Sequence, residues 1–524
     1  MGSKNLESGV NANGTSAALN LDIWYLILDQ IDSRKDLCNI CLTSRAWYTM
    51  AIPHLYKTVT LAMMGSRLDW DMKSDRMEVA RSLSSRLLDS KNEQLRQVVH
   101  ELDFGRFGDE DDDDDDVIHD MEKRLVALVD CLPNLQRVKI RFPLTDETLR
   151  QLTEHGKSIS LYLFCEDGKR HVENKLQNVV AIRALVDPFD ESEGPNRHVL
   201  GIQKLMFACP NLKSFSFETS GGYGGCVIRL PWFEQIYSFQ FSGDETFPPL
   251  EELSLSGYRP SEDEWEHWQK KFPWSTLRSL TLGPRYAADF LDLAVGYITS
   301  LRNLTVEIYT DEDRKSHCPQ LTKFLRTFGS LESLTVEGYT LPLEPIGHHP
   351  GLKHLCLHSF EPARGDIQRP TLGVEQLREL DKSCAHLETL ELDLYRDGEW
   401  PEHILKTLAT GFKNLRRLTL HLELGLRQLE GQRTSSQEEN MRIKPILTEG
   451  SAREVGQQFF TWSSLSKVGV LVLKTGEPLR RYPQWEPSYC RFERRHAETI
   501  EVYRPSHRGG VPEVAVTSRP DTRY

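Results

Sequence analysis

The sequence predicts an α/β fold in which a small three-helix unit is followed by a long array of strand and helix repeats. Two patterns lead to this prediction. A six-residue block with apolar residues at its first, fourth and sixth positions recurs through residues 98–475, and the residues between blocks have helical spacing. Residues 18–60 instead have the apolar periodicity of amphipathic helices. The 524-residue chain is 39% hydrophobic and 27% charged, which is the composition of a folded protein.

The helical unit is predicted to contain three short helices. Ile23, Ile27 and Ile31 form one helical stripe, and the cap-type residue Ser33 precedes a second run with the same spacing. The third run is predicted to stop at Pro53. A unit of this size cannot bury much apolar surface alone, so its surplus of Leu, Ile and Trp is expected to serve a partner or a neighbouring domain.

The stretch LNLDIWYLILDQIDSRKDLCNICLTSRAW resembles the F-box. It matches without a gap the family's Leu-Pro-x-Glu-Ile opening, its Ile-Leu pair, its Leu-Asp turn and its Leu-x-x-Leu-x-Leu-x-Ser-Lys-x-Trp segment, with Asp22 for Glu and Arg45 for Lys. The resemblance implies docking onto a Skp-type adaptor and, through it, onto cullin and RING subunits. The residues that it implies for adaptor binding are Leu19, Asn20, Ile23, Trp24, Ile27, Leu28, Ile31, Leu37, Leu42, Ser44, Arg45 and Trp47.

One position departs from the F-box pattern. Asn20 stands where the family usually has Pro, which leaves the first turn less rigid and predicts a weaker affinity for the adaptor. A second interpretation, an ordinary three-helix cap on a larger core, explains the same apolar stripes without an adaptor.

The remaining segments outside the repeats are predicted from their composition. Residues 61–97 have helical spacing and are expected to link the helical unit to the repeats. Residues 1–17 are rich in Asn, Gly and Ser, and the acidic run within 105–118 repels itself, so both are expected to be disordered. Residues 476–524 are expected to add one strand before a mobile tail.

The recurring block is Leu-x-x-Leu-x-Leu or a close variant. From Leu250 onward its starts lie 27, 24, 30, 21, 35 and 28 residues apart, which is close to the roughly 20 to 29 residues of a leucine-rich repeat. One strand and one helix cannot bury their own apolar face, so stacked units with a continuous Leu core are expected. The blocks are Leu135–Ile140, Leu212–Phe217, Leu250–Leu255, Leu277–Leu282, Leu301–Val306, Leu331–Val336, Leu352–Leu357, Leu387–Leu392 and Leu415–Leu420, with weaker forms at Val99–Phe104, Ile159–Phe164 and Val468–Leu473.

The stretches between blocks are predicted to form the outer helices of this curved solenoid. Ser261 and Glu264 have the spacing of a capping box ahead of Trp265 and Trp268, whose rings are expected to pack in the core. The Trp-rich repeat SGYRPSEDEWEHWQKKFPWSTLRSLTLGP and the segment HLYKTVTL are similar to fungal F-box proteins with leucine-rich repeats.

Composition excludes several other classes of protein. No apolar run approaches the ~20 residues that span a bilayer, and the net charge of −13 argues against nucleic-acid binding. Ten cysteines without a disulfide framework and a start without a secretory signal predict the cytoplasm or the nucleus. Cys38 and Cys41 form a lone C-x-x-C on a helix, and no catalytic arrangement is recognised, so no metal, cofactor or enzymatic activity is predicted.

The repeat strands also predict where a partner binds. If the block leucines face inward, the residues between them form a column on the concave side of the sheet, and acidic residues flank its C-terminal half. These features predict a partner with a basic segment. The residues proposed for this surface are Thr305, Glu307, Thr335, Glu337, His354, Cys356, His358, Glu391, Asp393 and Thr419.

An F-box followed by leucine-rich repeats resembles the substrate receptors of SCF ubiquitin ligases. That resemblance implies that the chain brings a bound protein next to a ubiquitin-charged conjugating enzyme, with proximity as its contribution to catalysis. Two alternatives are an adaptor-bound assembly factor or scaffold that acts outside any ligase, and a plain repeat scaffold without an adaptor.

Overall fold

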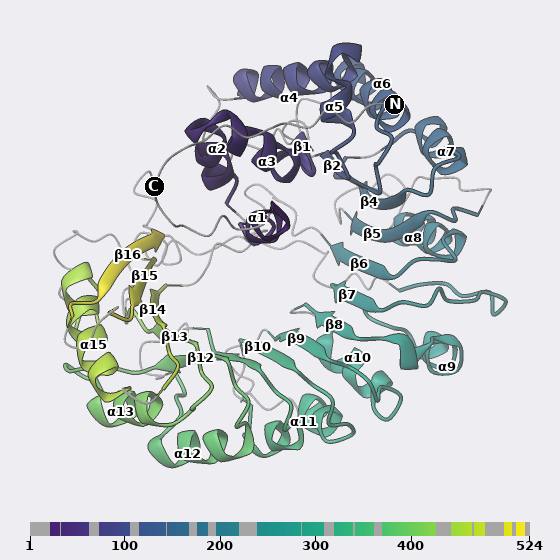
Figure 1. The fold of residues 1–524 in the computed structure, drawn as a ribbon. Coiled ribbons are helices and arrows are strands. Elements are labelled where there is room, and N and C mark those ends of the chain that lie inside the picture. Colours follow the sequence, from purple (N-terminus) through teal and green to yellow (C-terminus); the bar gives the residue numbers. More distant parts are fainter. Residues whose placement is uncertain are drawn as a thin grey trace, which may run out of the picture. The chain divides into compact units, whose positions relative to one another are not determined.

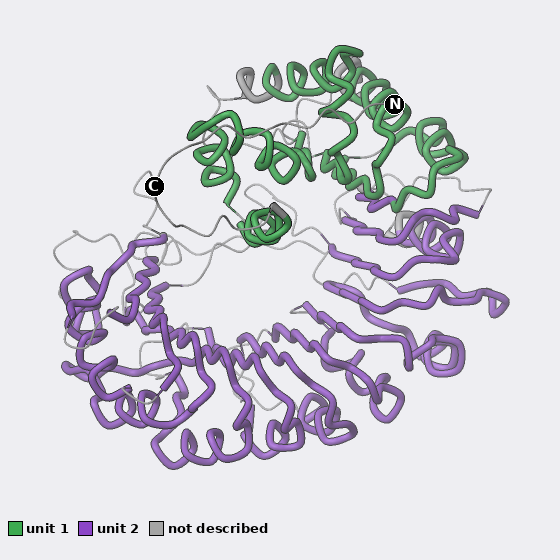
Figure 2. Tube along the Cα trace, viewed as in Figure 1, with its two compact units in different colours: residues 1–160 green, residues 161–524 purple. Residues whose placement is uncertain are grey.

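The computed structural model describes sixteen segments of the chain, which divides into two compact units, residues 1–160 and 161–524 (Figure 2). The described residues are 21–31, 33–61, 73–104, 115–142, 144–166, 175–186, 195–219, 238–283, 286–308, 319–338, 341–360, 369–425, 442–463, 466–476, 497–505 and 510–518.

The first unit begins with three helices and continues with three short parallel strands. In register, Val59, Leu102 and Val138 pair across those strands, and all three side chains are buried. The elements of this unit are α1 (Leu21–Leu28), α2 (Arg34–Thr43), α3 (Arg45–Tyr56), β1 (Thr58–Leu61), α4 (Lys73–Leu88), η2 (Ser90–Asn92), α5 (Glu93–Arg96), β2 (Glu101–Phe104), α6 (Asp115–Cys131), β3 (Arg137–Ile140) and α7 (Asp146–Glu154).

Side-chain caps fix where several of these helices begin. The hydroxyl of Ser33 accepts a hydrogen bond from the Asp36 amide, and the hydroxyl of Ser44 accepts one from the Trp47 amide, both at 3.2 Å. The prediction that the third helix stops at Pro53 is wrong, because α3 continues to Tyr56. Proline removes only one amide donor from the helix, and the remaining turn still packs on its neighbours.

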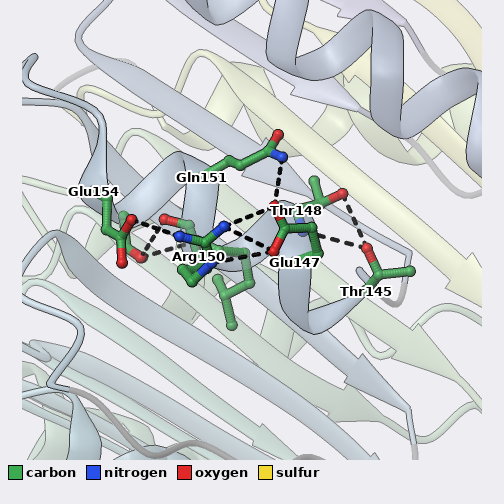
Figure 3. Close-up of polar contacts among 8 residues, drawn as sticks. Thr145, Glu147, Thr148, Arg150, Gln151 and Glu154 are labelled. Atoms are coloured by element: carbon green, nitrogen blue, oxygen red, sulfur yellow. Dashed lines mark hydrogen bonds and ion pairs between the residues drawn. The ribbon is translucent and has the colours of Figure 1, made fainter.

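Helix α7 shows how polar surface contacts stabilise a helix in this unit (Figure 3). The hydroxyl of Thr145 caps the helix by accepting a hydrogen bond from the Thr148 amide at 3.3 Å. On the outer face, the guanidinium of Arg150 lies 2.8 Å from Glu147 and 2.9 Å from Glu154, which are neighbours at i−3 and i+4. These contacts are exposed and join residues within α7, so they stabilise this helix and do not form a binding site.

The second unit alternates strands with helices, as the spacing of the blocks predicts. Strands β4 to β14 are parallel wherever their pairing is described, and β15 and β16 add antiparallel partners to β14. Its elements are β4 (Ser160–Glu166), β5 (Val179–Val186), α8 (Pro195–Ala208), β6 (Ser214–Thr219), β7 (Glu252–Ser256), α9 (Glu262–Lys271), η4 (Trp274–Thr276), β8 (Ser279–Leu282), α10 (Ala287–Ala294), β9 (Asn303–Glu307), α11 (Pro319–Leu325), β10 (Ser333–Glu337), η5 (Glu344–His348), β11 (His354–His358), α12 (Val374–Ser383), β12 (Thr389–Leu394), α13 (Glu402–Thr410), β13 (Arg417–Leu422), α15 (Glu449–Trp462), β14 (Val470–Thr475), β15 (Glu498–Tyr503) and β16 (Glu513–Ser518).

The block leucines form the core of the second unit, as predicted. The helices lie on the outer side of its curved sheet (Figure 1), and the leucines of neighbouring strands pair in register beneath them. Leu334, Leu355 and Leu390 occupy one such row, and each side chain is at most 2% exposed. Burying a leucine side chain stabilises a fold by roughly 1.5–3 kcal/mol, so the rows together supply much of the driving force.

Of the two tryptophans on α9, Trp268 packs in the core as the sequence predicts, whereas Trp265 is only half-buried. The Trp268 side chain is fully buried, and its indole nitrogen donates a hydrogen bond of 2.8 Å to the Tyr258 hydroxyl. That hydroxyl donates in turn to Glu264, which also closes the predicted capping box with Ser261. The cap thus anchors the start of α9 to the aromatic core.

Three strands and one helix start were not predicted. β1, β5 and β16 lack the Leu-x-x-Leu-x-Leu order, although the VVAIRALV sequence of β5 is rich in β-branched residues that favour strands. β16 lies within the tail predicted to be mobile and pairs with β15 instead. α6 begins at Asp115, so 115–118 are helical rather than part of a loop, because negative charge favours a helix N-terminus. Residues 105–114 of that predicted loop lie outside the described part of the chain.

Candidate functional site

The three N-terminal helices have a small buried core. Leu28, Leu37 and Ala51 form it, one residue from each helix, and Trp24 meets Trp47 edge to face with ring centroids 4.9 Å apart. Leu28 and Leu37 belong to the set predicted for adaptor binding, yet their side chains are only 1% and 4% exposed. The helical spacing that singled them out also describes residues that pack inward, and these two support the surface rather than form it.

The same helices expose an unusual share of apolar surface. Of the eight large apolar side chains that are exposed among the described residues, five lie on α1 to α3, namely Ile23, Leu26, Ile27, Leu42 and Tyr48. Ile23, Leu26 and Ile27 are spaced i, i+3 and i+4 and therefore share one face of α1. Leu26 and Leu42 are the most exposed, at 66% and 84%. Such a concentration of exposed apolar residues is typical of a protein-binding surface.

The remaining residues predicted for adaptor binding have other positions. Ile31 and Trp47 are half-buried against the small core, Trp24 is half-buried beside Trp47, and Arg45 is exposed. Ser44 is the N-cap of α3, which gives its hydroxyl a structural task. Leu19 and Asn20 lie outside the described residues. The pattern did not single out Leu26 or Tyr48, although helical spacing from Ile23 was a signal for Leu26.

The predicted column on the concave side of the second unit is present. The strand registers pair its members one after another, and since side chains alternate along a strand, the column faces away from the leucines. Thr305, Thr335 and Cys356 lie at its centre and are half-buried, whereas Thr419 is buried. In order, the column is Ser216, Ser254, Thr281, Thr305, Thr335, Cys356, Glu391 and Thr419.

Asp393 does not form the open acidic surface that the sequence suggests. Its side chain is 5% exposed, and the carboxylate lies 2.8 Å from Nδ1 of His358 and 2.9 Å from the Arg369 guanidinium. It also accepts a hydrogen bond of 2.6 Å from the Ser359 amide. Because Arg369 is itself buried, Asp393 and His358 form an internal polar network and are not available to a partner.

The negative charge of Glu391 is also balanced by side chains of the same sheet. Its Oε1 lies 2.5 Å from Nε2 of His421 and 2.8 Å from Nζ of Lys474. Burial raises the pKa of Glu391, but the hydrogen bonds and charges of His421 and Lys474 outweigh it and lower the pKa to about 2. The carboxylate is therefore ionised, with its charge balanced by Lys474.

Other predicted residues of the concave side are ordinary surface groups. Glu307 and Glu337 pair in register on β9 and β10 and are half-buried, and Nδ1 of the exposed His354 lies 2.8 Å from the Thr389 hydroxyl. Burial raises the pKa of Cys356 well above its ordinary range, so its thiol stays protonated and unreactive. Across the described segments, no group of His, Cys, Asp and Glu side chains is arranged to hold a metal ion.

A row of charged residues at the start of the strands was missed. The second position of each block from β6 to β13 is charged, and from Glu251 onward each amide in the row donates to the preceding member's carbonyl at 2.7 to 2.8 Å. Opposite charges meet along the row, for example Lys353 with Glu332 at 2.7 Å. The signal was visible as the repeated order Leu-charged-x-Leu. The row consists of Lys213, Glu251, Arg278, Arg302, Glu332, Lys353, Glu388 and Arg416.

The paired strands, inward leucine rows and outer helices define the fold as a leucine-rich-repeat fold. Stacked repeats of this kind create an extended concave surface on which partners can bind. None of the helices in the described part of the chain combines the length and apolarity needed to cross a membrane.

Comparison with known proteins finds likeness at the level of structure alone. No protein-family model matches the sequence, and no curated protein matches it. The leucine-rich-repeat protein LegL7 from Legionella pneumophila is similar over 78% of this chain and 99% of its own, with 13% identity and a TM-score of 0.31. A TLR13–ssRNA13 complex matches 64% of this chain and 45% of the matched chain, with 13% identity and a TM-score of 0.30.

Proposed function

We propose that this chain is the substrate-recognition subunit of an SCF-type E3 ubiquitin ligase, with α1 to α3 binding a Skp-type adaptor and the repeats binding the substrate protein. The observation that carries the proposal is the concentration of exposed apolar residues on a three-helix unit whose sequence resembles the F-box. The binding fold that follows it supports the second half of the proposal. Cytoplasm or nucleus is the proposed location, because the ten cysteines are spread through the chain without the spacing of a disulfide framework.

The adaptor is proposed to cover the exposed face of α1 and the end of α2. Ile23, Leu26 and Ile27 present one apolar stripe, and Leu42 is the most exposed large apolar residue described. Interface anchors of this kind typically cost on the order of 2 kcal/mol or more when truncated. Because Leu28 and Leu37 are buried beneath, substitutions there would test folding rather than docking.

The substrate is proposed to lie against the concave side of the second unit. The column from Ser216 to Thr335 offers hydroxyl groups on five successive strands, and Glu307 and Glu337 lie beside it. A basic segment is proposed to meet these two half-buried carboxylates beside the column. The chain would contribute by holding the substrate close to the conjugating enzyme.

The adaptor half of the proposal is tested with a tagged chain carrying Leu26→Asp and Leu42→Asp. Both side chains are exposed, so the folded core should be unaffected, and we expect the adaptor and cullin to be lost from the copurified proteins. The matched control is Val79→Asp with Val511→Asp, because these residues are 65% and 63% exposed but lie outside α1 to α3. The control should retain both partners.

The outcomes separate the candidate functions. Capture of adaptor and cullin that depends on Leu26 and Leu42 supports a ligase subunit, whereas adaptor without cullin would indicate an assembly or scaffold role outside a ligase. If the wild-type chain captures neither protein, the F-box interpretation is wrong. Proteins that accumulate when the chain is deleted, and that bind the Thr305→Arg and Thr335→Arg variant less well, would identify the substrate and its site.

A further inference from the structure

A polar groove crosses the starts of strands β11 to β14 in the second unit. Its volume is about 410 Å³. Two rows of side chains line it, one just before and one just after the first apolar residue of each block. The residues that matter for its chemistry are Lys353, His386, Glu388, Asn414, Arg416 and Lys467.

The backbone holds these side chains in a fixed order. The Glu388 amide donates to the Lys353 carbonyl at 2.7 Å, and the Arg416 amide donates to the Glu388 carbonyl at 2.7 Å. Neighbouring strands are about 4.8 Å apart, so Lys353 and Arg416 arise about 10 Å apart on a rigid sheet edge. The groove therefore has a defined spacing of charges and does not depend on a flexible loop.

The groove carries an excess of positive charge. It contains three cations and one carboxylate, and the Arg416 guanidinium lies 3.5 Å from that carboxylate, Glu388. Lys467 donates its hydrogen bond of 2.9 Å to the neutral amide of Asn414, so this contact leaves its charge unbalanced. Lys353 shares Glu332 with Arg302, which lies 3.8 Å from the same carboxylate. In a chain of net charge −13 this edge is a local positive region.

We propose that this groove binds a short acidic segment of a protein partner. Its extent across four strands is about 14 Å, which matches roughly four residues of extended chain. Arg416 can receive a carboxylate through its guanidinium fork, and Lys353 and Lys467 present ammonium groups on either side. This inference rests on the partner-binding half of the proposed function and concerns a different surface from the concave side.

A protein segment fits the groove better than a nucleic acid. Each added nucleotide brings another phosphate, and a strand longer than the groove would extend over a chain whose net charge is −13. An acidic peptide can confine its charges to the positive region. Binding of this exposed kind should weaken as salt rises.

The test measures fluorescence anisotropy of a labelled eight-residue peptide of alternating Glu and Ser with the full-length chain at low salt. The variant reverses the groove with Lys353→Glu, Arg416→Glu and Lys467→Glu, and we expect its affinity to fall at least tenfold. A second variant with Gln at the same three positions should lower affinity in the same direction, and it avoids new repulsion with Glu332 and Glu388. A Lys and Ser peptide should not bind the groove.

The matched control reverses three exposed cations of the same unit, Lys382, Lys406 and Arg453, and so changes the net charge by the same amount. It should bind the acidic peptide as the wild type does. Equal loss in the control, or unchanged binding in both groove variants, would overturn the inference. Tighter groove-dependent binding of an eight-nucleotide oligothymidylate would overturn the choice of a peptide. Adaptor capture, measured on the same variants, should persist, so failure of the groove and failure of the proposed function are distinguishable.

Discussion

The imidazole rings of His358 and His421 stack on the concave side of the sheet, with centroids 3.8 Å apart and planes 20° apart. Each ring contacts a carboxylate of β12, His358 through Asp393 and His421 through Glu391. Burial lowers the pKa of His421 below its ordinary value, and the hydrogen bond to Glu391 opposes this effect. The stacked pair and its two carboxylates hold β11, β12 and β13 in a rigid polar patch.

Arg369 should be essential to this patch. Arg369→Met would leave Asp393 buried without its nearest cation, and breaking a buried pair in this way costs about 3–5 kcal/mol. We expect a lower melting temperature and faster hydrogen exchange in β11 and β12. Arg150→Met removes an equally well-formed but exposed pair and should leave both measurements unchanged. Similar loss in the two variants would contradict the buried role of Arg369.

His349 should make the second unit sensitive to acid. Its side chain is fully buried beside Phe328, and burial lowers its pKa to about 4, against a smaller opposing effect of the Leu325 carbonyl. The folded-state pKa lies below the unfolded value of 6.5, so the neutral ring of His349 contributes to the stability of the fold. That contribution is fully present above pH 6.5 and is lost as pH falls toward 4. The loss is about 1.4 kcal/mol for each pH unit at most.

The His349→Leu variant tests this pH dependence. Its melting temperature should fall less than that of the wild type between pH 6.5 and 4.5, since no proton needs to be excluded from the core. His403→Leu replaces an exposed histidine and should follow the wild-type curve. Parallel curves for wild type and His349→Leu would show that another group controls the acid response.

Glu264 should have the opposite pH dependence. Burial raises its pKa to about 7, although hydrogen bonds from Ser261 and Tyr258 oppose the shift. Since the folded-state pKa exceeds the unfolded value of 4.5, its stabilising contribution is present below pH 4.5 and is lost as pH rises through 7. Glu264→Gln should remove this decline between pH 5 and 8 in thermal melting. Glu262→Gln, an exposed neighbour on α9, should retain it.

The leucine rows should be the most sensitive part of the second unit. Leu334→Ala or Leu355→Ala removes a side chain that is 0% or 2% exposed, and such changes cost about 2–5 kcal/mol. Because each repeat contacts its neighbours, hydrogen exchange should increase in β9 to β12 together. Lys413→Ala, an exposed change on the same unit, gives the reference. A loss of protection confined to the substituted strand would contradict the shared core.

The local spacing of residues in the sequence was sufficient to predict the repeat architecture. Alternation along a strand has a period of two, so the order Leu-x-x-Leu-x-Leu alone assigns Leu334 to the core and Thr335 to the opposite side, and the registers agree. The capping box at Ser261 and Glu264 was also visible, because both partners lie within one turn. β5 was missed because its β-branched residues do not follow the leucine order.

Contacts between distant residues were decided by the tertiary structure. Spacing places both Leu26 and Leu28 on a helix, but only packing against α2 and α3 buries Leu28 and leaves Leu26 exposed. The sequence suggests that Asp393 is a surface acid, but in the fold its carboxylate accepts a hydrogen bond from Arg369, which lies 24 residues earlier. The groove at Lys353, Arg416 and Lys467 requires the four strands β11 to β14 to align side by side. A sequence pattern shows which residue types alternate along the chain. The charge balance and exposure of a side chain depend on which other side chains lie close to it in the folded structure.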